Sequence, residues 1–151
     1  MRKFLCDSIF PLIPVMLAAS PAHAQLGAAP FAMDPRHAQA AVTTARPATS
    51  YTIQTHREGA TTIREFVTPG GKVFGVAWEG AVIPDLRDLL GASSFQRFSA
   101  HNQSHAQPGM RMAHLDAADL VVHSQGHPRH FVGNAYLPGQ IPRGVSVQDI
   151  R

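Results

Sequence analysis

The sequence predicts a small single α+β domain, in which an antiparallel β-meander and a second β-hairpin carry one or two short helices on one sheet face. Three observations lead to this fold class. Between Tyr51 and Trp78, β-branched and aromatic residues come in three runs, separated by Glu58-Gly59 and by Pro69-Gly70-Gly71. After Trp78 the apolar spacing changes from period two to helical spacing, and two further strand-like runs follow between residues 119 and 136.

The first 24 residues have the organisation of a secretory signal peptide. Arg2 and Lys3 precede a mostly apolar run, and Ala22-His23-Ala24 places small residues at the two positions that signal peptidase recognises. The apolar run is too short to cross a membrane and is interrupted by Asp7 and two prolines. We therefore expect an exported protein, periplasmic or secreted, that is cleaved after Ala24 and then has no membrane span.

Cleavage would change the chemistry available to the chain. Cys6 is the only cysteine, so the mature protein would have neither an internal disulfide nor a thiol nucleophile. The remaining arginines are scattered singly along the sequence. Nucleic-acid binding usually needs a basic stripe with interleaved aromatic residues, and this distribution argues against it.

Residues 25–50 contain many Ala, Thr and Pro residues and little periodicity. We interpret them as a flexible or extended lead-in to a domain that covers residues 51–151. Leu26, Phe31 and Met33 are the side chains of this lead-in that could cover a sheet edge.

The second turn of the meander decides which side chains share a sheet face. If Pro69-Gly70 is a two-residue loop, Thr68 faces Gly71; if Gly71 is a one-residue bulge, Thr68 faces Lys72. A one-residue slip moves every side chain to the opposite face. We prefer the bulge because it gathers six apolar residues on one face, beside a misfit Arg64 that would extend its head into water. The six are Tyr51, Ile53, Phe66, Phe74, Val76 and Trp78.

Two short helices are expected after the meander. Pro84 suits the first position of a helix that presents a stripe of leucines and ends at Gly91. A second helix would begin with Ser93 or Ser94 as its N-cap. Both should pack on the apolar face of the meander, whereas residues 101–114 contain no strand pattern and should form a loop.

The second hairpin contains the densest group of histidines. With residues 125–128 as a four-residue loop, His123 and His130 become direct cross-strand neighbours, and His127 lies in the turn between them. These three imidazoles are a candidate site for Zn²⁺ or Cu²⁺. Solvated histidines on a polar face are the simpler interpretation, because no recognised ligand spacing and no neighbouring carboxylate is present.

Catalytic and cofactor motifs are weak throughout. Ser124, His123 and Asp119 have the residue types of a hydrolase triad, but adjacent strand residues point to opposite faces and no G-x-S-x-G elbow is present. Asp85 and Asp88 share a helical face near a helix start, where a negative charge is favourable in itself. We expect no enzyme and no cofactor.

Five segments distributed over the chain carry a family resemblance: Arg64-Glu65-Phe66-Val67, Val73–Trp78, Pro84-Asp85-Leu86, Gly126-His127-Pro128-Arg129 and Ala135-Tyr136-Leu137-Pro138. Together they resemble domain-of-unknown-function family 2844, a family of small exported proteobacterial proteins. The resemblance implies a Gram-negative exported protein and supplies no catalytic residues.

The functional expectation is therefore a non-enzymatic binding or envelope-associated module, whose partner would be an envelope protein. A mixed sheet face with Val67, Val73 and Ala77 is one candidate surface, and cover by residues 25–50 is an equally good explanation of it. The alternative function is a periplasmic metal-binding protein that uses His123, His127 and His130. A hydrolase is the third and weakest possibility.

Overall fold

The computed structural model describes residues 25–31, 44–45, 51–105 and 112–151. The expected signal peptide at residues 1–24, Met33 and most of the lead-in lie outside these ranges. Within them, no helix has both the length and the apolar character needed to cross a membrane.

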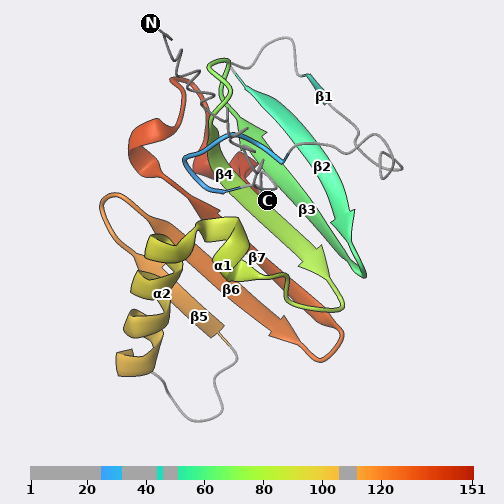
Figure 1. The fold of residues 1–151 in the computed structure, drawn as a ribbon, viewed down its shortest axis with the longest axis vertical. Helices are drawn as coiled ribbons and strands as arrows, with labels where there is room; N and C mark the ends of the chain where they lie inside the picture. The colour runs from blue at the N-terminus through green and yellow to red at the C-terminus, as the bar shows by residue number, and fades with distance from the viewer. Residues whose placement is uncertain (1–24, 32–43, 46–50, 106–111) are drawn as a thin grey trace, which may run out of the picture.

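One antiparallel sheet organises the described chain (Figure 1). Its strand order is β1-β2-β3-β4-β7-β6-β5, so two three-stranded meanders are joined through the β4–β7 pair. Six strands form the body of the sheet, and β1 is a two-residue pairing at its edge. The strands are β1 (Thr44–Ala45), β2 (Thr52–Glu58), β3 (Thr61–Val67), β4 (Val73–Gly80), β5 (Met112–Asp116), β6 (Val121–His127) and β7 (His130–Tyr136).

Two helices connect the meanders and lie on one face of the sheet (Figure 1). The helix α1 (Leu86–Leu90) begins at Asp85, whose side chain accepts hydrogen bonds from two backbone N–H groups. Pro84 therefore precedes the cap instead of starting the helix. The helix α2 (Ala92–His105) follows directly after Gly91. It continues about one turn past residue 100, where the predicted loop would have ended it.

The predicted bulge at Gly71 is confirmed. Thr68 and Lys72 face each other, with Thr68 N donating to Lys72 O over 2.8 Å, and Gly71 has a positive φ of 74°. A second irregularity follows immediately, because Val67 pairs with Val73 whereas Phe66 pairs with Gly75. Phe74 is thus an extra residue in β4.

This second bulge overturns the prediction that six apolar residues share one face. Phe66 and Phe74 pack with Tyr51 on one side of the sheet, whereas Val76 and Trp78 pack on the other. The helices cover the Trp78 side and not the Phe66 side. The helix side is where Ile63, Val67, Leu90, Phe98 and Val122 are buried.

The opposite face has its own smaller core, which the C-terminal tail closes. Ile150 is fully buried there against the aromatic cluster of Tyr51, Phe66 and Phe74. The tail runs through two 3₁₀ turns, η1 (Pro138–Gln140) and η2 (Val147–Asp149), and Ser146 caps the second. The side of the sheet that carries this second core is called the tail side below.

Part of the lead-in, which the sequence indicates is flexible or extended, is hydrogen-bonded to the sheet and packs on it through Leu26 and Phe31. Gly27 N donates to Val73 O over 2.8 Å, and Val73 N donates to Ala28 O over 3.0 Å. Leu26 is buried beside Leu89 in the helix-side core. Intramolecular cover by residues 25–31 therefore explains part of the apolar surface of β4.

Two predictions for the second half of the chain are wrong. The supposed loop at residues 101–114 contains the end of α2 and the start of β5. In the second hairpin the turn is Pro128-Arg129, with His127 paired with His130. Arg129 takes a positive φ of 68°, a conformation that the sequence pattern would assign to the nearby Gly126.

Candidate functional site

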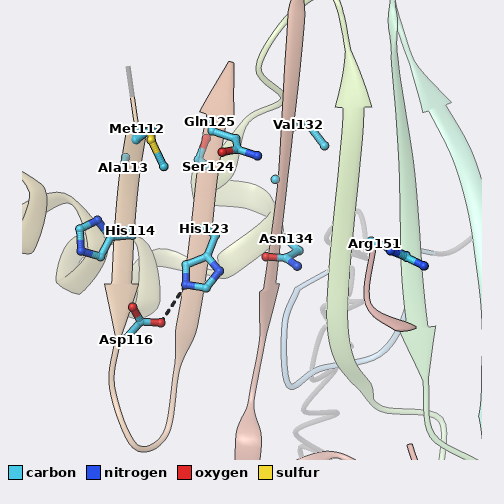
Figure 2. A pocket seen from close by; sticks show the side chains of 11 residues that line it. Met112, Ala113, His114, Asp116, His123, Ser124, Gln125, Val132, Asn134 and Arg151 are labelled. Carbon is cyan, nitrogen blue, oxygen red and sulfur yellow. Dashed lines mark hydrogen bonds and ion pairs between the residues drawn. The ribbon is translucent and has the colours of Figure 1, made fainter. Parts of the chain in front are cut away.

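A shallow groove lies on the tail side of the sheet, over β5, β6 and β7 (Figure 2). Its volume is about 470 Å³. We call it the open-face groove. Side chains that line it include Met112, His114, Asp116, His123, Gln125, Asn134 and Arg151.

Strand alternation explains the character of the groove. Along β6, His123 and Gln125 point to the tail side. The residues that alternate with them, Val122 and Ser124, are buried on the helix side. The C-terminal tail covers the same sheet face only as far as Arg151, which lines the groove at the tail's end. The groove therefore occupies the part of the face that the tail leaves uncovered.

The best-defined polar contact in the groove joins two strands. His123 Nε2 lies 2.8 Å from Asp116 Oδ1, and both side chains are about half exposed. Figure 2 shows this contact between neighbouring strands β5 and β6. A carboxylate partner for His123 was not expected from the sequence, because β5 had not been recognised as a strand.

The three histidines predicted as a metal site are not brought together. His127 and His130 are paired at the tip of the hairpin, but His123 pairs with Asn134. Four residues separate His123 from His127, which corresponds to about 13 Å along a strand. The described residues contain no group of three histidine, cysteine or carboxylate side chains already arranged as a metal site.

The triad-like residues are likewise separated. Ser124 is almost completely buried on the face opposite His123. Asp119 makes a bidentate contact with Arg97, in which both N–O distances are 2.8 Å. The hydrogen bond from Arg97 lowers the pKa of Asp119 below its usual range. The structure thus contradicts a catalytic arrangement of these three side chains.

The most unusual titratable group is one that the sequence did not single out. Glu65 is 0% exposed on the helix side, where its Oε2 accepts a hydrogen bond from Phe31 N over 3.1 Å. Its Oε1 has no hydrogen-bond partner among the described residues. Burial raises the pKa of Glu65 to about 7, and the Phe31 hydrogen bond acts in the opposite direction. Its position between Ile63 and Val67 in a period-two pattern was the signal that could have revealed this burial.

His56 lies beside this buried carboxyl group and belongs to the same face. Its ring stacks on Phe31 with a centroid distance of 4.9 Å, and burial lowers the pKa of His56. A small cavity of about 270 Å³ opens beside Phe31 and His56 and reaches the start of α1 at Asp85. Residues 25–31 are therefore held on the sheet by the contacts of Phe31 as well as by the backbone hydrogen bonds of Gly27 and Ala28.

Comparison with known proteins gives one match. No curated protein and no solved structure is detectably similar to this chain. The family described as "Protein of unknown function (DUF2844)" matches residues 22–150, which is nearly the whole sequence. The resemblance found in the sequence is thereby confirmed, and the chain belongs to this family.

Proposed function

We propose that this protein is an exported, non-enzymatic binding module, and that the open-face groove holds a segment of another exported protein of the cell envelope. The signal-like leader supports export, because only a chain routed out of the cytoplasm needs such a segment. The separation of Ser124, His123 and Asp119 supports a binding role in preference to a hydrolytic one.

One observation carries the proposal: in the part of the chain that the structure describes, the two faces of the sheet are covered unequally. Helices and residues 25–31 cover the helix side, and the C-terminal tail covers the β2–β4 end of the other side. The open-face groove remains over β5–β7. A sheet face that a protein leaves uncovered is a natural surface for a partner.

The chemistry of the groove favours a protein partner over a small molecule. Met112 is 58% exposed at its rim, and Asp116 and Arg151 provide charges of both signs. Protein interfaces combine apolar contacts with a polar rim in this way. Small-molecule sites instead enclose most of their ligand, whereas most residues that line this groove lie side by side on three neighbouring strands (Figure 2).

Site-specific photocrosslinking in the native envelope tests the proposal. A photoreactive residue at Gln125, in the groove, should produce one recurrent crosslinked protein. The same residue at Gln103, on the exposed surface of α2, should not. Equal crosslinking from both positions, or none from Gln125, would contradict the proposal.

A matched pair of substitutions shows whether the crosslink depends on the groove. Met112→Glu places a charge at the groove rim, while Val82→Glu changes a residue of nearly identical exposure (59%) outside it. We expect Met112→Glu to abolish the Gln125 crosslink and Val82→Glu to leave it intact. Loss in both variants would indicate a general effect of added charge.

A further inference from the structure

We infer that His101, His105 and His114 form a binding site for a divalent transition-metal ion such as Zn²⁺ or Cu²⁺. This site lies where α2 meets β5, and it is distinct from the histidines of the second hairpin. The inference does not rest on the proposed binding function, since two of the three ligands are outside the open-face groove.

The helix provides two of the ligands. His101 and His105 are one turn apart on α2, and their rings stack with centroids 4.2 Å apart and planes 21° apart. Residues four positions apart share one helical face. They lie in the last turns of the helix, where the helix dipole favours a positive charge.

The strand provides the third ligand. The His114 ring centroid lies 6.0 Å from that of His101. Figure 2 shows the His114 side chain extending from β5 away from β6. The backbone N–H of His114 donates to Asn102 Oδ1 over 3.2 Å, which ties this position of β5 to α2. This hydrogen bond joins α2 and β5 beside the rings of His101 and His114.

A hydrogen bond already sets one ligand in the form that a metal needs. His105 Nδ1 is 2.8 Å from the backbone oxygen of His101. A carbonyl oxygen only accepts, so Nδ1 carries a proton, and in the neutral imidazole Nε2 then keeps a free lone pair. Metal-binding histidines commonly donate their second ring nitrogen to a backbone carbonyl in this manner.

Small side-chain rotations would bring the ligands to one point. Tetrahedral Zn²⁺ with Zn–N bonds of about 2.0–2.1 Å holds two imidazole ring centroids about 5 Å apart, so the stacked rings, whose centroids are 4.2 Å apart, would have to spread. The three rings do not yet converge. His105 and His114 are exposed, so rotating their rings loses part of the His101–His105 stacking but little buried surface. Three imidazoles with a water as fourth ligand suit Zn²⁺ and Cu²⁺.

Metal titration of the untagged protein from Gln25 onward tests the inference. Calorimetry with Zn²⁺ and with Cu²⁺ should show one site, and visible absorption of the Co²⁺ form should report nitrogen ligands. His101→Ala/His105→Ala should weaken binding by at least about tenfold. The matched control, His127→Ala/His130→Ala, removes two histidines from the hairpin tip and should leave the affinity unchanged.

A second variant keeps the test independent of folding defects. His105→Gln/His114→Gln removes one ligand from each element and should give the same loss of affinity, with circular dichroism checking that each variant is folded. Absence of binding at micromolar metal would overturn the inference. A loss shared equally with the control, or confined to the control, would overturn it as well.

Discussion

Glu65 places an ionisable group where the fold offers it little solvation. The carboxyl group is buried beneath residues 25–31, and one of its oxygens has no hydrogen-bond partner. Since burial disfavours the charged form, the pKa rises from 4.5 to about 7. The folded protein therefore retains a proton that the unfolded chain loses at lower pH.

The stability of the protein should fall as the pH rises through this interval. Glu65 stabilises the folded state fully below about pH 4.5, and the contribution disappears as the pH passes about 7. Glu65→Gln, which stays neutral, should be more stable than the wild type above pH 7. The gain should approach about 3 kcal/mol, at about 1.4 kcal/mol per pH unit of the shift. Urea unfolding between about pH 4 and pH 8 measures it.

Glu79→Gln is the control for this prediction. Glu79 is half exposed and lies 3.5 Å from Arg64, so its substitution should change stability little at any pH. A constant difference between Glu65→Gln and the wild type at all pH values would show that the Glu65 carboxyl group is already ionised when the protein is folded.

At the scale of elements, the C-terminal tail acts as part of the core. Ile150 is 0% exposed and packs against Tyr51, Phe66 and Phe74. Asn134 Nδ2 also donates to Ile150 O over 2.8 Å, which ties the tail to β7. The tail therefore covers part of the second sheet face, a role that a further helix would have in a larger domain.

Ile150→Ala should destabilise the fold strongly. Removing a buried isoleucine side chain costs about 2–5 kcal/mol through lost burial and the cavity that remains. Thermal or urea unfolding measures the loss, and Val147→Ala, at a 44% exposed position in the same tail, should change stability by less than about 0.5 kcal/mol. Similar effects from both substitutions would mean that the tail is not docked.

The sequence was sufficient for most elements because their local signals were strong. The three strands of the first meander, the two helices and the Gly71 bulge followed from turn chemistry and period, although the first turn is Gly59-Ala60 and not Glu58-Gly59. The bulge at Phe74 did not, because Gly75 lies inside a run of strand-forming residues and gives no turn signal. Ile150, which is distant in sequence, packs over Gly75. Such tertiary contacts are invisible to a local pattern.

The candidate site was less predictable for a related reason. Strand β5 has five residues, of which only Leu115 is buried, so its alternation is too weak to recognise. Without β5, neither Asp116 beside His123 nor His114 beside α2 could be anticipated. The predicted register of the β6–β7 hairpin was also wrong, because the residue with a positive φ in its turn is Arg129 and not a glycine.

At the scale of the whole molecule, one sheet carries two different surfaces. Among the described residues, α1, α2 and residues 25–31 close its helix side (Figure 1), and the C-terminal tail closes the β2–β4 end of its tail side. The open-face groove is the consequence of this arrangement. The histidines of α2 and β5 lie next to it, at the edge of the sheet.

The central claim, that the open-face groove is occupied in the cell, can be tested by chemical labelling. In a Cys6→Ser background the chain contains no cysteine, so Gln125→Cys reports the groove and Glu58→Cys reports an exposed position outside it. We predict that a maleimide labels both sites at similar rates in the purified protein. In intact envelopes, Gln125→Cys should react about tenfold more slowly than Glu58→Cys, because a bound partner covers a specific patch. Equal labelling rates at the two sites in the envelope would contradict the account.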